Sequence, residues 1–221
     1  MIKPVKYKTA DYDNVFIVSD LHMNQVSGVV LEKRGFGSMQ EHDNYIKEKW
    51  FTYITQESLV LDLGDSHFNC GDEVLFTEFS KWPAKDHLYL WGNHISSAKQ
   101  AYQRRMTELM MDEGYESYPC RYNNIIFYGH YLELKIDHHS FVASHFPIAV
   151  HNNCAKGWKQ ICGHSHNGFH DSLISNPDGL IGDFGVEAAL EYTNRERPFF
   201  TLAEVIEIFS TKFHQSKDLH H

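Results

Sequence analysis

Five short apolar runs in the sequence each end in polar side chains of the kinds that bind divalent metal ions. The runs read VFIVSDLH, LVLDLGDSH, LYLWGNH, FVASHFP and ICGHSH. The polar residues at their ends are Asp20, His22, Asp65, Asn93, His94, His145, His164 and His166. One such ending is ordinary turn chemistry, and one histidine is more often a core residue than a ligand. Five in a row predict a metal site.

Other sequence patterns give no competing site. The segment GFGSMQ lacks the third glycine of a dinucleotide-binding loop and does not follow a strand pattern. The sequence contains no phosphate-binding P-loop, no H-E-x-x-H zinc motif and no C-x-x-C pair. The metal-binding interpretation is therefore the one that the motifs favour.

The elements that must position these side chains follow from the apolar pattern. Runs of four or five apolar residues predict strands that are buried on both faces. Between them, Ser38 and Glu41 have the spacing of a capping box, which predicts a helix over 38–54. The apolar residues on one face of that helix are Ile46, Trp50, Tyr53 and Ile54.

Two more helical stripes and one hairpin complete the expected elements. The first stripe, which Pro83 ends, contains Leu75, Phe79 and Trp82. The second stripe, which Gly114 ends, contains Tyr102, Met106, Leu109 and Met110. The segment IIFYGHYLELKI predicts two antiparallel strands around a type II′ turn at Gly129-His130. These elements predict an α/β fold with a mixed sheet, in which sites collect at the carboxyl ends of the strands.

Length, charge and cysteine content set further limits. The chain of 221 residues is predicted to form a single domain, 1–221. Its net charge of -9 argues against binding of extended duplex nucleic acid. No apolar run approaches the length of a membrane span, and the N-terminal sequence has no apolar segment typical of a secretion signal. Without paired spacing, Cys70, Cys120, Cys154 and Cys162 are expected to be reduced thiols in a cytoplasmic protein.

The order of the motifs resembles a known family. D-x-H, G-D, G-N-H, H and G-H-x-H, which run from Phe16 to His166, resemble the calcineurin-like metallophosphoesterase superfamily. The segments RGFGSMQEHDNYIKEKW, ASHFP and GVEAALEYTNRERPFFTLAEVIEI are similar to a bacterial and phage branch of it. This resemblance implies mixed β-sheets packed face to face and flanked by helices, an αββα sandwich. It also implies a metal-dependent hydrolase of phosphate esters.

The resemblance assigns roles to the individual residues. Asp20, His22 and His166 would hold one metal ion, and Asn93, His145 and His164 would hold the second. Asp65 would bridge both ions, and His94 would be the catalytic histidine beside the phosphate. The family usually has an acidic residue after G-N-H that supports this histidine. Ile95 occupies that position here, which leaves the protonation of His94 without that support.

The chemistry of such a centre is consistent with these residue types. Two ions about 3.5–4 Å apart can share a hydroxide that attacks a phosphate ester in line. Two aspartates do not neutralise two divalent ions, so the centre stays cationic in a chain of net charge -9. Mixed nitrogen and oxygen ligands suit Mn, Fe, Zn or Ni, and we expect manganese to support activity.

Other functions within the same fold remain open at this point. A phosphodiesterase is preferred over a phosphomonoesterase. A nuclease would need basic residues to cluster in space, and the candidates are Arg34, Arg104, Arg105, Arg121, Lys156 and Lys159. A catalytically silent metal-binding scaffold would be expected to have lost ligands, whereas all seven are present.

Overall fold

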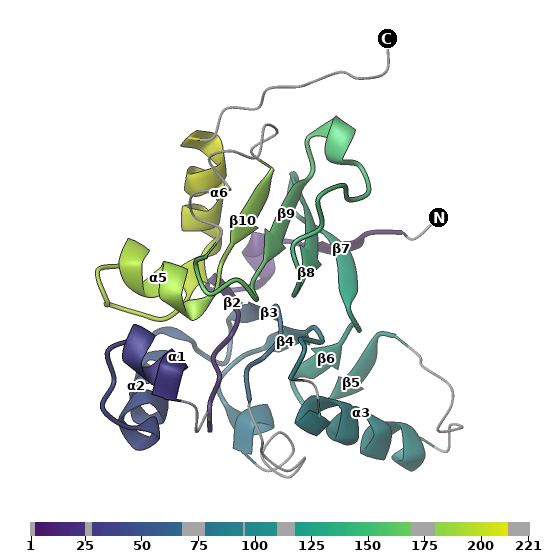
Figure 1. Cartoon of the computed structure of the whole chain (residues 1–221). Coiled ribbons are helices and arrows are strands. Elements are labelled where there is room, and N and C mark those ends of the chain that lie inside the picture. The colour runs from purple at the N-terminus through teal and green to yellow at the C-terminus, as the bar shows by residue number, and fades with distance from the viewer. Residues whose placement is uncertain are drawn as a thin grey trace.

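Two mixed β-sheets form the centre of the computed structural model, which describes residues 3–24, 28–67, 78–94, 96–109, 118–168 and 180–211 (Figure 1). In spatial order, the strands of the six-stranded sheet are β11 (Phe200–Thr201), β2 (Val15–Val18), β3 (Leu59–Asp62), β4 (Asp86–Tyr89), β6 (Ile125–Phe127) and β5 (Cys120–Tyr122). Those of the five-stranded sheet are β1 (Val5–Tyr7), β7 (Tyr131–Ile136), β8 (His139–Ser144), β9 (Lys159–Cys162) and β10 (Ile181–Asp183).

Helices flank the sheets. The α-helices are α1 (Gly28–Lys33), α2 (Met39–Tyr53), α3 (Ser96–Glu108), α5 (Val186–Tyr192) and α6 (Leu202–Thr211). The 3-10 helices are η1 (Thr9–Asp11), η3 (Phe79–Lys81) and η4 (Cys154–Lys156). Figure 1 shows α5 and α6 beside β10, and α3 beside β5 and β6. The expected α/β fold, with mixed sheets flanked by helices, is thereby confirmed.

The parallel register of the strands brings their carboxyl ends to one level. In the six-stranded sheet, Val18 pairs with Asp62 and Asp62 pairs with Tyr89, so β2, β3 and β4 end side by side. In the five-stranded sheet, β8 and β9 are also parallel, and Ala143 pairs with Ile161. The loops that follow these five strands carry all the predicted ligands.

The six-stranded sheet is buried on both faces, as the apolar runs predict. Along β2, Phe16 and Val18 pack into a core with α2 and α3, whereas Val15 and Ile17 pack between the two sheets. All four residues are at most 3% exposed. This alternation follows from the two-residue period of a strand, and it explains why the run contains no polar position.

Helix α2 begins where the capping box predicts. Ser38 Oγ accepts a hydrogen bond from the backbone N–H of Glu41, and Ile46 and Trp50 are fully buried. The Glu41 carboxylate accepts a hydrogen bond from the backbone N–H of Gly37 instead of from that of Ser38. The first turn of the helix therefore has its donors satisfied by a variant of the expected box.

The predicted hairpin at Gly129-His130 is wrong. β6 pairs with β4 and β5 in one sheet, whereas β7 pairs with β1 and β8 in the other. The chain crosses between the sheets at Gly129, whose φ is +77°. Ile126 and Leu132 both pack into the core between the sheets. Each strand therefore buries more apolar surface in its own sheet than it would in a two-stranded hairpin.

The helical stripes are confirmed in part. Tyr102 and Met106 are buried on α3, but Leu109 lies beyond the helix end and is 46% exposed. Phe79 and Trp82 are buried around the short η3 turn. Leu75, Met110 and Gly114 lie outside the described residues.

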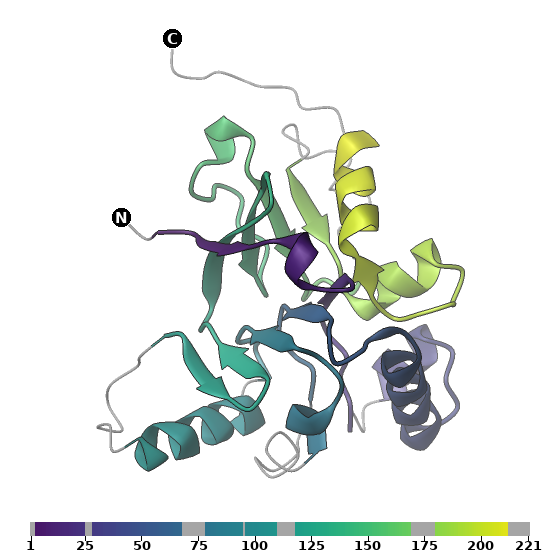
Figure 2. The same cartoon turned by 180° about the vertical axis from the view of Figure 1, so that it is seen from behind.

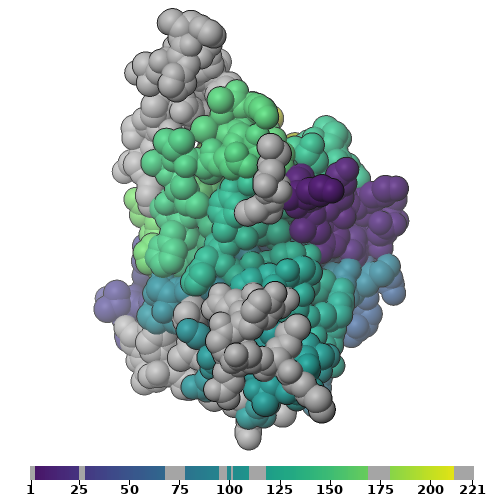
Figure 3. Space-filling model, turned by 90° about the vertical axis from the view of Figure 1, so that its right-hand side faces the viewer, coloured from purple at the N-terminus to yellow at the C-terminus, as the bar shows by residue number. Residues whose placement is uncertain are grey.

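The N-terminal strand closes the second sheet. β1 pairs in parallel with β7, and Figures 2 and 3 show it running along the teal and green surface of that sheet. Cys120, Cys154 and Cys162 form no disulfide within the described part of the chain, and Cys70 lies outside it. Within the described part of the chain, no helix is long and apolar enough to cross a membrane.

Candidate metal centre

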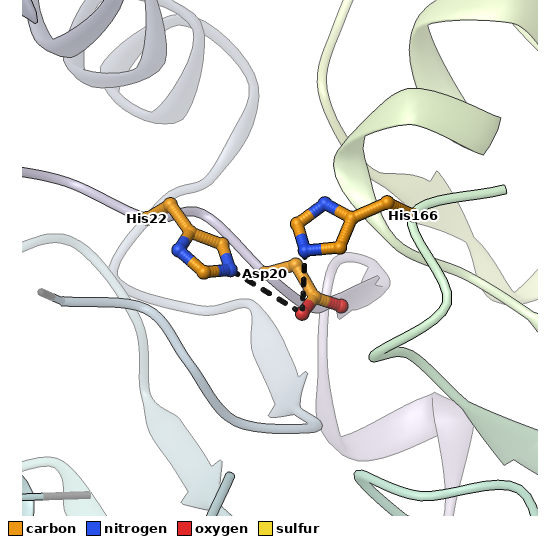
Figure 4. Close-up of side chains that lie close together, drawn as sticks. All are labelled: Asp20, His22 and His166. Carbon is orange, nitrogen blue, oxygen red and sulfur yellow. Dashed lines mark ion pairs between the residues drawn. The ribbon is translucent and has the colours of Figure 1, made fainter. Parts of the chain in front are cut away.

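Three predicted ligands from two different sheets meet at the carboxyl ends of β2 and β9 (Figure 4). Asp20 Oδ1 lies 3.6 Å from Nε2 of His22 and 4.0 Å from Nε2 of His166. The two imidazole rings are 4.9 Å apart between centroids. Figure 4 shows both rings directing a nitrogen toward the same carboxylate oxygen. These three residues form the first group able to hold an ion, as the sequence predicts.

A second group shares one carboxylate with the first. Nε2 of His145 lies 3.1 Å from Asp65 Oδ2 and 3.9 Å from Asp20 Oδ1. The same nitrogen is 3.0 Å from Asn93 Oδ1, which lies 2.8 Å from Nδ1 of His164. The structure therefore brings all seven predicted ligands together.

The position of the shared carboxylate differs from the expected one. The resemblance makes Asp65 the bridge, whereas in the structure Asp20 belongs to both three-residue groups and Asp65 belongs only to the second. The backbone N–H of His94 donates to Asp65 Oδ1 at 2.8 Å, which turns that oxygen toward the loop after β4. The bridging role of Asp65 remains a prediction.

The gaps around Asp20 fit a divalent ion. Asp20 Oδ1 is buried and accepts no hydrogen bond from the described residues. Three histidine Nε2 atoms surround it at 3.6, 3.9 and 4.0 Å, each too far for a good hydrogen bond. Ligand atoms that each lie about 2.0–2.2 Å from one ion are roughly 3–3.5 Å apart. A small closure of the loops would therefore give metal coordination.

The backbone around the ligands adopts a sparsely populated conformation. Five predicted ligands have a positive φ: Asp20 (56°), His22 (50°), Asp65 (56°), His164 (70°) and His166 (49°). Asp and His enter this left-handed region more readily than most residues. Such backbones persist only where the surroundings enforce them, and they collect at functional sites.

Two glycines allow the loops to approach the carboxylates. A Cβ atom on Gly163 would lie 2.0 Å from Ser19 Oγ and 2.3 Å from Asp20 Oδ2. A Cβ atom on Gly92 would lie 1.8 Å from Asp65 Oδ1. The glycines of G-H-x-H and G-N-H are therefore needed for space next to the two aspartates.

The second carboxylate oxygen of Asp20, Oδ2, is held in place by hydrogen bonds. Asp20 Oδ2 accepts hydrogen bonds from Ser19 Oγ at 2.8 Å and from the backbone N–H of His164 at 2.9 Å. Burial alone would raise the pKa of Asp20, but contacts with His22, His145 and His166 lower it below its ordinary value. The carboxylate is therefore ionised and oriented with Oδ1 toward the histidines.

A buried ion pair behind His166, which no local sequence pattern indicates, supports the first group. Glu187 Oε1 accepts a hydrogen bond from Nδ1 of His166 at 2.8 Å and one from Nε of Arg34 at 2.9 Å. Arg34 also donates to the backbone carbonyls of Asp20 and Leu21. Burial opposes the charge on Glu187, but His166 and Arg34 lower its pKa to about 2. This pair fixes the imidazole of His166 with Nε2 toward Asp20.

His94 lies at the edge of the ligand groups. Its ring is 5.4 Å from that of His22, in an edge-to-face arrangement, and is half-buried. Burial lowers the pKa of His94, while the charge of Asp65 acts in the opposite direction. Ile95, which follows G-N-H in the sequence, lies outside the described residues.

Comparison with known proteins gives a likeness of fold. No model of a protein family matches the sequence, and no curated protein matches it. Among solved structures, the fold is similar to that of a protein of unknown function, AQ665 from Aquifex aeolicus, with a TM-score of 0.59. The two share 13% sequence identity, over 88% of this chain and 98% of that chain. At this identity, the similarity is evidence for the fold alone.

Proposed function

We propose that this protein is a phosphoesterase of the calcineurin-like type that works with two divalent metal ions and prefers phosphodiesters. The observation that carries the proposal is the meeting of seven nitrogen- and oxygen-bearing side chains from five strand ends in two sheets. Five of them form two groups that share Asp20, and Asn93 and His164 join the second group through His145. A structural role alone would leave unexplained the positive φ of five ligands and the buried oxygen Asp20 Oδ1, which has no hydrogen-bond partner among the described residues.

The residues divide between two ions. Asp20, His22 and His166 would hold the first, and Asn93, His145 and His164 would hold the second, with Asp65 beside both. When bound, two such ions polarise a phosphoryl oxygen and make a water molecule more acidic. Because the two ligand groups contain only the carboxylates of Asp20 and Asp65, two divalent ions would leave the centre cationic, and it would attract an anionic ester in spite of the negative net charge of the chain.

His94 supplies the proton chemistry in this proposal. Its backbone N–H is held by Asp65, and its ring is partly exposed beside His22. From there, the imidazole can donate a hydrogen bond to a phosphoryl oxygen and a proton to the departing ester oxygen. It is not needed to hold metal, so its replacement should leave metal content unchanged.

The proposed function is tested by metal analysis together with turnover. Protein reconstituted with manganese should bind about two ions per chain and hydrolyse bis-p-nitrophenyl phosphate. The variant His22→Ala should retain about one ion and lose most of the activity, because only the first group loses a ligand. The matched control is His138→Ala, which removes an exposed histidine from the β7–β8 turn and should leave both readouts within about twofold.

Other results of these two measurements would indicate a different function or contradict the proposal. Two bound ions without turnover of any ester would indicate the metal-binding scaffold. Faster turnover of p-nitrophenyl phosphate would indicate a phosphomonoesterase, and cleavage of single-stranded nucleic acid with a steep salt dependence would indicate a nuclease. Absence of bound metal under saturating manganese would contradict the proposal.

A further inference from the structure

Phe146 is an exposed aromatic residue that touches two candidate ligands of the second ion. Its ring lies 5.1 Å from the ring of His145 and 4.6 Å from the ring of His164, edge to face in both cases. The side chain is nevertheless 42% exposed. One part of the ring therefore packs on the metal-binding residues, and another part is open to solvent beside them.

Buried polar groups hold this exposed residue in place. The backbone carbonyl of Phe146 accepts hydrogen bonds from Ser144 Oγ at 2.8 Å and from Nε2 of Gln160 at 3.0 Å. Gln160 is fully buried, and its Oε1 accepts from the backbone N–H of Ile148 at 2.9 Å. The loop is thus fixed on both sides of the exposed ring from inside the five-stranded sheet. Such fixation lowers the entropy lost when a ligand binds.

Position distinguishes Phe146 from the other exposed large apolar side chains. In the described part of the chain these also include Val29, Phe51, Leu109, Val150 and Tyr192. The ring of Phe51, for example, packs on the ring of Trp82. Phe146 is the member of this set whose ring contacts two candidate ligands.

We propose that Phe146 is a stacking platform for an aromatic group on the ester substrate, and that this group is a nucleobase. The inference rests on the proposed function, which places a phosphate between the two ligand groups. A base on the adjoining nucleoside can then lie on the exposed part of the ring. Stacking of one base on an aromatic side chain typically changes affinity by about tenfold or more, for any of the bases. The substrate class is therefore nucleotide esters or short single strands, without strict base selection.

The experiment compares diesters that share one leaving group. Manganese-loaded protein is given methyl p-nitrophenyl phosphate, phenyl p-nitrophenyl phosphate and thymidine 5′-p-nitrophenyl phosphate. We expect kcat/KM for the thymidine ester to exceed that for the methyl ester by about tenfold or more. Phe146→Leu should abolish this preference through KM, so that the thymidine and methyl esters then have similar values of kcat/KM. Phe146→Trp should keep the preference. Phe51→Leu is the matched control and should change neither value.

The outcomes separate this inference from the proposed function. Preference for the phenyl ester over the thymidine ester would overturn the nucleobase assignment. Equal losses for all three esters in Phe146→Leu, with lower metal content, would show that Phe146 only packs the ligands. If no ester is hydrolysed, the proposed function fails. In that case, calorimetry compares the binding of thymidine 5′-monophosphate with that of methyl phosphate. Tighter binding of the nucleotide that is lost in Phe146→Leu would support the stacking platform. Equal affinity of the wild-type protein for the two ligands would contradict it.

Discussion

The Glu187 carboxylate lies 2.8 Å from Nδ1 of His166 and thereby fixes which nitrogen of that ring faces Asp20. Glu187→Gln replaces an ionised acceptor by an amide, so the imidazole loses its strongest orienting contact. We expect binding of the first metal ion to weaken by about 10- to 100-fold, the range found for partners of metal-bound histidines. Isothermal titration with manganese measures this change.

The control for this variant is on the same helix. Glu191→Gln removes an exposed carboxylate whose hydrogen bond goes to Asn167, beside His166 but not to its ring. It should leave both metal-binding constants within about twofold. Equal weakening in the two variants would mean that the general charge of α5 acts on the site, instead of the contact with His166.

Gly163 offers a test of how closely the loops are packed. In Gly163→Ala, the new methyl group would overlap Ser19 Oγ and Asp20 Oδ2 unless the loop after β9 moved. We expect a loss of about 1–3 kcal/mol in the free energy of unfolding and a failure to bind the full complement of metal. Urea denaturation and elemental analysis measure the two effects.

Gly28→Ala is the corresponding control. Gly28 begins α1, and a Cβ atom there would have nothing within 4 Å. Alanine in a helix is neutral or slightly stabilising relative to glycine. Wild-type metal content in Gly163→Ala would show that the loop relaxes without disturbing Asp20, contrary to the expected effect.

The features of the site that could be predicted are those with a local pattern in the sequence. Asp20, Asp65 and Asn93 each follow an apolar run that is long enough to be a buried strand, and parallel strands end at a common level. The sequence alone therefore supports a shared location for the ligands. It also places α2, because Ser38, Ile46 and Trp50 lie at the spacing of a capped amphipathic helix.

The remainder depends on contacts between distant segments. Arg34 and Glu187 form a buried pair across 153 positions, and neither residue has a local pattern that indicates burial. The suggestion that Arg34 belongs to a basic nucleic-acid surface is wrong, since the side chain is 1% exposed and paired. The crossing at Gly129 has no local signal for a similar reason. Two apolar strands joined by a glycine turn fit a hairpin locally, and the pairing of the second strand in the other sheet depends on distant segments.

A pH effect on stability is expected at the pair formed by Tyr7 and Tyr128. Their hydroxyl oxygens are 3.1 Å apart, and burial raises the pKa of both groups above the ordinary value. A raised pKa in the folded state means that stability is complete below about pH 10 and is lost as the pH rises above it. Tyr7→Phe removes one of these ionisable groups. The free energy of unfolding of this variant should therefore fall less than that of the wild type between about pH 9 and about pH 11, which bracket the ordinary pKa of tyrosine. Urea denaturation at the two pH values gives the comparison, and equal losses would contradict the assignment.

The last prediction concerns the chemistry assigned to His94. If its imidazole gives a proton to the departing ester oxygen, its importance depends on the leaving group, since p-nitrophenolate departs without protonation and an alkoxide does not. We expect His94→Ala to lower kcat about 100-fold or more for thymidylyl-thymidine, and about tenfold or less for thymidine 5′-p-nitrophenyl phosphate. Metal content should match wild type, because His94 contributes its backbone N–H to Asp65 and that group survives the substitution. The same fold loss for both substrates, at full metal content, would show that His94 stabilises the phosphoryl oxygens and transfers no proton to the leaving group.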